Sequence, residues 1–141
     1  MTVSFLVRGI AQPKGSTKSF VVRRRSGALG TATTSDNPRL KGWQHAVATE
    51  ARLAAGGTFF DREVPVIVLV TFGLPRPASA PKRVTEPIRK PDIDKLLRAV
   101  LDGCTGVLWA DDAQVVEATG RKVYADAGDG PSARVTVRAA A

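Results

Sequence analysis

An apolar run near the middle of the chain places the strongest limit on how this sequence can fold. The run, Val64 to Phe72, is rich in β-branched residues and apolar at positions that would face both sides of a sheet. A strand with two apolar faces is typical of the interior of a sheet, where both sides are covered. The sequence therefore predicts a sheet with this segment as a central strand.

Weaker patterns predict the other elements of the sheet. We expect strands at 3–8, 114–124 and 133–138, with an Asp/Gly-rich turn at 126–130 between the last two. A short strand at 20–24 interrupts an otherwise loop-like stretch, 11–37. That stretch is either a disordered surface loop or a DNA-contacting arm that becomes ordered on binding.

Two helices complete the predicted fold. The first follows the start signal Ser35-Asp36-Asn37-Pro38 and continues to about Ala55, where Gly56-Gly57 ends it. The second runs from Asp94 to about Asp102, with Gly103 after its end. The order of elements predicts an α+β fold with one mixed sheet and two helices, in a single domain that spans residues 1–141.

The charge of the chain indicates a polyanionic partner. Lys and Arg number 21 against 13 acidic residues, a formal net charge of +8. Such an excess favours phosphodiester backbones or anionic surfaces, although it can also serve solubility alone. The basic residues gather in two stretches, 8–25 and 76–90, the second of which lies in a loop with five prolines between 73 and 91. We expect nucleic acid to contact these stretches and the start of the second helix through Lys14, Lys18, Arg23, Arg24, Arg25, Lys82, Arg83, Arg89, Lys90 and Lys95.

Acidic residues gather where the basic loop ends. Asp92-Ile93-Asp94 opens the second helix, and Asp111-Asp112 comes directly before the strand at 114–124. A helix of this length covers roughly 14 Å, and the segment from Gly103 to Asp112 can span up to about 28 Å. The chain can therefore bring Asp112 back to Asp92 and Asp94, and three carboxylates would suit a hard divalent cation such as Mg²⁺.

Each of these residues also has a simpler interpretation. Asp94 can be a helix N-cap and Asp92 a solvated loop residue. Arg98, one helical turn after Asp94, suits a fixed positive charge against a phosphate, or else a surface ion pair with Asp94 or Asp102. An EF-hand is excluded because the required oxygen ligands do not follow the Asp-x-Asp. An aspartyl-phosphate enzyme fits the spacing but leaves the basic loops unexplained.

The remaining reactive side chains favour structural roles. We expect His45 at the surface of the first helix, Asp102 at a helix end, and Cys104 in the core. A single cysteine provides neither a disulfide framework nor a zinc knuckle. Because no apolar run approaches the roughly 20 residues that span a membrane, we expect a soluble protein of the cytoplasm, in a bacterial or phage-infected cell.

The acidic motifs resemble those of the RusA family of Holliday junction resolvases, which includes phage-borne members. The resemblance covers the segment Lys90-Pro-Asp-Ile-Asp-Lys-Leu-Leu-Arg98, the pair Asp102-Gly103, and Gly106-Val-Leu-Trp-Ala-Asp-Asp-Ala-Gln-Val-Val116, and it ends at Lys122. It implies that Asp92, Asp94 and Asp112 are the essential metal ligands. It also implies a homodimer that needs Mg²⁺ or Mn²⁺ and makes paired nicks across a four-way junction, in DNA recombination and repair.

Two positions depart from the family pattern. Lys95 stands where the family usually has Asn, and Arg98 where it usually has Lys. An arginine keeps its charge at any working pH, so Arg98 can stabilise negative charge but cannot shuttle a proton. The sequence thus predicts a Mg²⁺-dependent, structure-selective endodeoxyribonuclease with Asp92, Asp94, Asp112 and Arg98 as its catalytic residues. The alternatives are a non-catalytic branched-DNA-binding protein and a nuclease that prefers flaps or forks.

Overall fold

A four-stranded mixed sheet forms the centre of the computed structural model, which describes residues 1–15, 17–35 and 37–140. The strands are β1 (Thr2–Arg8), β4 (Val66–Leu74), β5 (Val115–Tyr124) and β6 (Ser132–Ala139), in the order β1-β6-β4-β5. β4 runs antiparallel to β6 and parallel to β5. The predicted central strand is confirmed, with its bounds two residues later than expected. β5 lies at an edge of the sheet.

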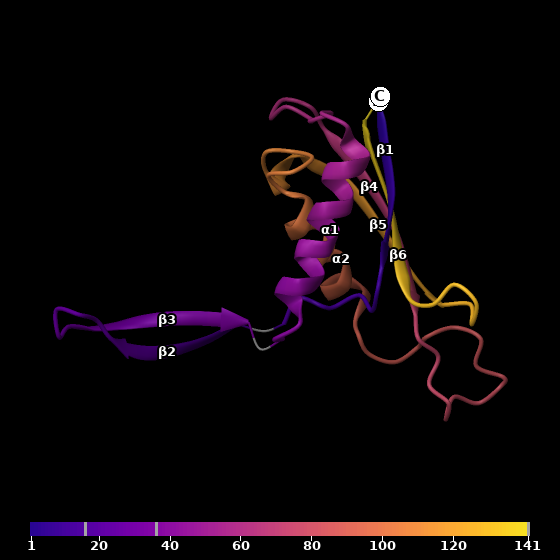
Figure 1. The fold of residues 1–141 in the computed structure, drawn as a ribbon, viewed down its shortest axis with the longest axis horizontal. Coiled ribbons are helices and arrows are strands. Elements are labelled where there is room, and N and C mark those ends of the chain that lie inside the picture. Colours follow the sequence, from indigo (N-terminus) through magenta and orange to yellow (C-terminus); the bar gives the residue numbers. More distant parts are fainter. Residues whose placement is uncertain (16, 36, 141) are drawn as a thin grey trace.

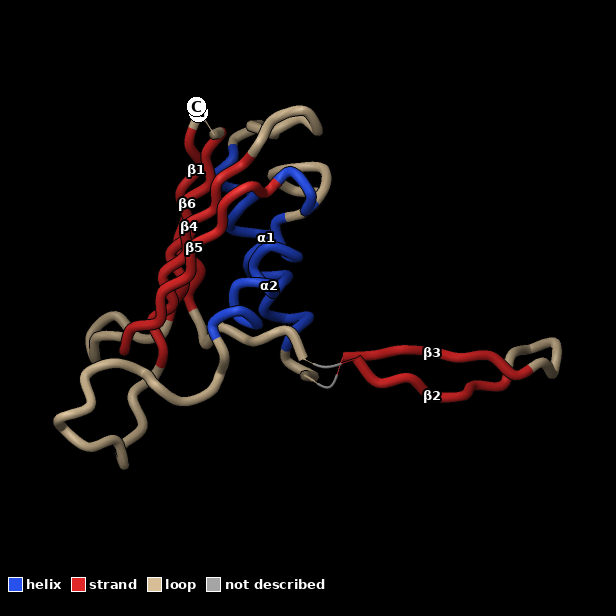
Figure 2. Tube along the Cα trace, turned by 180° about the vertical axis from the view of Figure 1, so that it is seen from behind, coloured by secondary structure: helices blue, strands red, loops and turns tan. Residues whose placement is uncertain are grey.

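Both helices, α1 (Leu40–Ala55) and α2 (Ile93–Cys104), lie on one face of this sheet (Figures 1 and 2). The core between them is aliphatic and aromatic: Trp43 and Val47 of α1 and Leu96 and Val100 of α2 are buried. The other face of the sheet is more polar, because alternate residues of a strand point to opposite sides. The expected α+β fold with two helices is therefore confirmed.

α2 continues past its predicted end, through Gly103 to Cys104. At Gly103 the two helices come close together: an added Cβ would lie 3.2 Å from the backbone oxygen of Gln44 and 3.2 Å from the Val47 side chain. The glycine allows this close approach and does not end the helix. α1 begins at Leu40, where Asn37 Oδ1 accepts a hydrogen bond from the Arg39 amide at 3.1 Å; Asp36 of the predicted start signal lies outside the described residues.

A two-stranded hairpin projects from the body (Figure 1). It consists of β2 (Thr17–Arg23) and β3 (Leu29–Ser35), which form a sheet of their own. The short strand expected at 20–24 is thus part of a longer one, and the expectation of loop over 29–35 was wrong. The sequence signal is weak there because the β3 sequence, Leu-Gly-Thr-Ala-Thr-Thr-Ser, has Leu29 as its one large apolar residue and shows no apolar alternation.

The proline-rich segment after β4 is a loop, as predicted, and one arginine organises it. Arg76 donates to the backbone oxygens of Val84 at 2.7 Å and Pro81 at 2.8 Å. Its guanidinium lies over the Tyr124 ring, 4.9 Å from the ring centre. These contacts fold the loop back on itself beside the end of β5. Across the described residues, no helix is both long and apolar enough to cross a membrane.

Candidate active site

The first carboxylates of the site lie at the start of α2. Asp92 is the N-cap residue, with extended backbone angles (φ −72°, ψ 140°), and Asp94 lies in the first turn. Both side chains are exposed, and neither forms an ion pair within the described part of the chain. The Asp92 side chain makes no capping hydrogen bond. The partial positive charge at a helix N-terminus stabilises such carboxylates while leaving their oxygens open to a ligand.

β5 holds the segment that leads into Asp92. Lys122 Nζ donates to the backbone oxygens of Arg89 and Pro91, each at 2.9 Å. Two residues earlier, Gly120 lies under Ile93, whose side chain would be 3.1 Å from an added Cβ. Lys122 is the last residue of the motif that resembles the family, and its role could not be inferred from the motif. These contacts make it a positioning residue for the start of α2.

Asp112 lies in a tightly bonded turn before β5. The buried Gln114 organises this turn: its Oε1 accepts from the amides of Ala110 at 2.8 Å and Asp111 at 3.0 Å. Its Nε2 donates to three backbone oxygens in the segment 60–64. The side chain of Asp111 accepts from the Ala113 amide and pairs with Arg62 at 3.3 Å. Asp111 therefore has a structural role, and Asp112 remains exposed to solvent.

The position of Asp112 corrects one expectation. Its carboxylate accepts a hydrogen bond from the hydroxyl of Thr105, the residue that follows α2. The 12 residues of α2 correspond to a length of about 18 Å, so Asp112 lies at the opposite end of the helix from Asp92 and Asp94. The expectation that one chain brings all three together was wrong, because the segment 105–111 turns back at the C-terminal end of α2. Accordingly, the described residues contain no group of three metal-binding side chains.

Within one chain, the carboxylates available to bind a metal ion at the start of α2 are therefore two, Asp92 and Asp94. Asp92 lines a surface hollow with Lys14 and Lys90, and Asp94 lines a neighbouring hollow with Lys14 and Arg98. Lys95 lies between the two and lines both. Because Asp94 is inside the helix, the two carboxylates do not have the same-side placement of an extended strand. Mg²⁺ is often held by one or two protein carboxylates together with substrate phosphates, and Asp92 and Asp94 fit that description; a three-carboxylate set within one chain does not.

Two cations next to Asp94 share one partner. Asp102 lies 3.2 Å from Lys14 Nζ and 3.7 Å from Arg98 Nε. The Lys14 amide also donates to the Lys95 oxygen at 2.9 Å, so the base of the hairpin packs across the first turns of α2. The surface ion pair considered for Arg98 is present, but with 66% of its side chain exposed Arg98 can still reach a phosphate. The sequence identified Asp102 only as a residue at a helix end.

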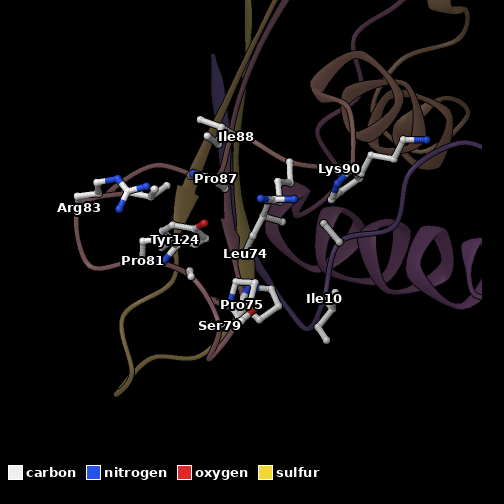
Figure 3. A pocket seen from close by; sticks show the side chains of 16 residues that line it. Ile10, Leu74, Pro75, Ser79, Pro81, Arg83, Pro87, Ile88, Lys90 and Tyr124 are labelled. Carbon is white, nitrogen blue, oxygen red and sulfur yellow. The ribbon is translucent and has the colours of Figure 1, made fainter.

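The predicted DNA-contacting residues lie on two projections and at the start of α2. Arg23, Arg24 and Arg25 are exposed at the tip of the hairpin; the side chain of Lys18 is outside what the structure describes. Lys82, Arg83, Arg89 and Lys90 are exposed on the proline-rich loop, which projects at the same end of the body (Figure 1). Beneath that loop is a cavity of about 660 Å³, mostly lined by apolar residues including Ile10, Leu74 and several prolines (Figure 3).

The other reactive side chains lie outside this region. His45 is exposed on α1. Cys104 is buried, and its burial raises the pKa of the thiol to about 12. At neutral pH this cysteine is therefore a protonated core residue, as expected, and not a nucleophile.

These features define a class of protein. The α+β body exposes carboxylates at the start of a helix and carries a cationic projection on either side of them. This arrangement of charged groups is typical of an enzyme that acts on phosphodiesters. The chain belongs to the RusA family of endodeoxyribonucleases, whose family model matches residues 11–138. No individual curated protein matches the sequence. The resemblance carried by the motifs between Lys90 and Lys122 is thus confirmed, and the family supports nuclease activity.

Proposed function

We propose that this protein is a divalent-metal-dependent endodeoxyribonuclease that resolves four-way DNA junctions by paired nicks. One observation carries the proposal: Asp92 and Asp94 are exposed, without ion pairs in the described residues, at the start of α2. In a RusA-family chain, such carboxylates between basic surfaces are suited to hold a metal ion against a DNA phosphate.

The chemistry divides between the ion and the chain. Mg²⁺, with Mn²⁺ as a substitute, would supply the Lewis acid for attack of water on the phosphorus. Asp92 and Asp94 of one chain are the proposed ligands, together with Asp112 from the second chain of the homodimer that the family resemblance implies. Arg98 places a permanent positive charge beside Asp94, where it stabilises charge on the scissile phosphate. A guanidinium does not release its proton at working pH, so Arg98 acts electrostatically.

We attribute DNA binding to the basic residues of the two projections, the hairpin and the proline-rich loop. The hairpin tip and the proline-rich loop carry exposed Arg and Lys side chains, and Lys90 of the loop lines the same hollow as Asp92. Phosphate contacts of this kind fix the position of the nucleic acid without reading its sequence, and they weaken steeply as salt rises. Recognition would accordingly depend on the shape of a branched substrate.

A competing function is junction binding without cleavage, which the unusual Lys95 and Arg98 would favour because both add positive charge next to the metal ligands. A preference for flaps or forks is a second alternative. Neither has a structural feature in its favour that the resolvase proposal lacks.

The test uses a panel of labelled DNAs, namely a four-way junction, a flap, a fork and a linear duplex, each incubated in Mg²⁺ and Mn²⁺. We expect paired nicks in the junction and little cutting of the duplex. Asp92→Asn should abolish cleavage, whereas Asp129→Asn removes the same charge from the exposed β5–β6 turn and should cut like the native chain. Undiminished cutting by Asp92→Asn would refute the assigned site, and junction binding without any cutting in either metal would select the non-catalytic alternative.

A further inference from the structure

The cavity beneath the proline-rich loop has no role in the chemistry described so far. Its volume of about 660 Å³ (Figure 3) lies within the range of about 300–1,000 Å³ that is usual for ligand pockets. We propose that this cavity receives one unstacked nucleobase of the DNA strand whose phosphate is bound near Asp92. The inference rests on the proposed function, and it gives the proline-rich loop a part in selecting branched DNA.

The cavity and the hollow that contains Asp92 share part of their walls. Ile10, Lys90 and Pro91 line both spaces, and Asp92 follows Pro91 directly in the chain. A nucleotide whose phosphate lies between Lys90 and the carboxylates therefore has the cavity beside it. One nucleotide can occupy the two spaces together, with its phosphate in the hollow and its base in the cavity.

The charges around the cavity match a nucleic acid strand. Arg83, Arg89 and Lys90 line it and are exposed, and none of the described residues in its wall is acidic. Cations in these positions can contact the phosphates on either side of an inserted base. An apolar peptide or a lipid chain would gain nothing from the three charges, so the rim favours a polyanion.

The interior of the cavity suits the flat faces of a base. Leu74 and Pro87 are buried in its wall, whereas Ile10 and Ile88 are large apolar side chains that remain 51% and 77% exposed. Tyr124 adds an aromatic ring to the same wall. Contact with apolar and aromatic side chains stabilises a single unstacked base, whichever base it is, because every base has two flat faces.

Hydrogen bonds within the loop shape the cavity before any DNA is bound. The Ala80 amide donates to the oxygen of Pro77, and the Val84 amide donates to the oxygen of Pro81, each at 3.0 Å. Arg76 ties the same segment together through the oxygens of Pro81 and Val84. A wall that is already ordered loses little conformational freedom on binding, so more of the contact energy contributes to affinity.

Such a cavity would favour branched over linear DNA. Moving a base out of a paired stack costs free energy, and the cost is smallest where pairing or stacking is already interrupted. The branch point of a four-way junction is such a place, whereas a linear duplex has to break a base pair to fill the cavity. Binding would therefore depend on the local pairing of the substrate.

Fluorescence of 2-aminopurine tests the insertion without relying on activity. This base analogue emits strongly when it leaves the stack. It is placed at each nucleotide beside the branch point in turn, or in the middle of one arm, in a junction kept uncut by excess chelator. We expect the native chain to raise the emission beside the branch point and not in the arm. No rise at any branch-point position would overturn the proposal.

Two matched double variants separate the cavity from exposed apolar surface in general. Ile10→Ser/Ile88→Ser removes two exposed side chains from the cavity, and Leu53→Ser/Phe59→Ser removes two that are 73% and 44% exposed and do not line it. We expect the cavity variant to lose the emission rise and to bind the junction about tenfold more weakly. Its Kd for linear duplex should be unchanged, and the control should behave like the native chain. Equal weakening for junction and duplex, or equal behaviour of the two variants, would overturn the proposal.

A mismatched duplex tests whether the unpaired base is what the cavity recognises. We expect the native chain to bind a linear duplex with a single mismatch more tightly than the fully paired duplex, because the mismatched base leaves the stack more easily. Ile10→Ser/Ile88→Ser should bind the two duplexes equally. A native chain that does not distinguish them would contradict the proposal.

A second copy of this chain is the competing occupant of an apolar cavity. Dissociation of a native dimer by Ile10→Ser/Ile88→Ser, measured by light scattering, without any emission rise for the native chain would select that occupant and overturn the proposal. A native chain that cuts junctions without an emission rise would refute this inference and leave the proposed function standing. An emission rise that the cavity variant abolishes, with a native chain that cuts no DNA, would do the reverse.

Discussion

The hydroxyl of Thr105 donates a hydrogen bond to the carboxylate of Asp112, across the turn that follows α2. The same hydroxyl oxygen accepts from Trp109 Nε1 at 3.0 Å, and Trp109 is fully buried. A core tryptophan thus fixes the threonine, and the threonine fixes the orientation of an exposed carboxylate. Thr105 is a positioning residue for the proposed ligand Asp112.

Replacing Thr105 should weaken catalysis more than DNA binding. Thr105→Val keeps the side-chain shape but removes both the donor to Asp112 and the acceptor for Trp109 Nε1. Loss of such a supporting hydrogen bond typically costs about 10–100-fold in activity or metal affinity. We expect single-turnover cleavage to fall in that range while the Kd for the junction stays within about twofold. Thr105→Ser restores the hydroxyl and should recover most of the rate. Equal loss in the Val and Ser variants would show that the hydrogen bond is not the cause.

Gln114 should contribute more to stability than an ordinary surface glutamine. Gln114→Leu would leave two partly buried amides and three carbonyl oxygens without their side-chain partner, for a cost of about 2–4 kcal/mol. Gln44→Leu is the matched control, since it removes one hydrogen bond, to Ala99 at 3.2 Å, and should cost about 1 kcal/mol. Urea denaturation followed by far-UV circular dichroism measures both. Similar losses of unfolding free energy in the two variants would contradict the role given to Gln114.

Two helical glycines should respond oppositely to alanine. At Gly42 of α1 an added Cβ has nothing within 4 Å, so Gly42→Ala should stabilise the protein by about 0.5–1 kcal/mol through helix propensity. At Gly103 the Cβ meets the Gln44 backbone and Val47 at 3.2 Å, and overpacking costs of about 1–3 kcal/mol outweigh the propensity gain. Thermal unfolding should therefore show a higher Tm for the first variant and a lower Tm for the second. A raised Tm for Gly103→Ala would mean that α1 and α2 are not in close contact there.

The hairpin tip should contribute salt-dependent DNA affinity. Replacing Arg23, Arg24 and Arg25 with alanine should reduce the slope of log K against log salt by up to about 2.7, since each phosphate contact contributes roughly 0.9. Arg52→Ala removes an exposed charge near the far end of α1 and should leave the slope unchanged. Fluorescence anisotropy with a labelled junction at several salt concentrations gives both slopes. If the triple variant kept the native slope, the hairpin would not contact phosphates.

Local sequence patterns were sufficient for most of the fold. The apolar run before residue 74 predicted the central strand, although the helices cover only one face of the sheet and Leu69 and Thr71 on the other face are exposed. The periodicity of Leu40, Trp43, Val47, Ala51 and Ala54 predicted the face that α1 buries; the first four are buried, whereas Ala54, near the end of the helix, is exposed. Gly103 misled the prediction because a glycine that ends a helix and a glycine that permits helix contact look identical without the neighbouring helix.

The position of Asp112 in the site was harder to predict from the sequence, for a geometric reason. Chain length between Gly103 and Asp112 permits a return to either end of α2, so reach alone did not determine where Asp112 lies. The contacts that do determine it come from Thr105 and from Gln114, which bonds to the distant segment 60–64. Such contacts have no local sequence signal, and neither do those of Lys122 or Arg76.

The most direct test of the proposed activity is single-turnover cleavage of a labelled four-way junction as Mg²⁺ is varied, compared between the native chain and Asp94→Asn. We expect cleavage by the native chain to rise with Mg²⁺, to stop in excess chelator and to return when Mn²⁺ is added. Asp94→Asn should bind the junction at least as tightly as the native chain, because it removes a negative charge, but should not cut it. Cleavage that persists in chelator, or that survives in Asp94→Asn at the native rate, would contradict metal-dependent hydrolysis at the start of α2.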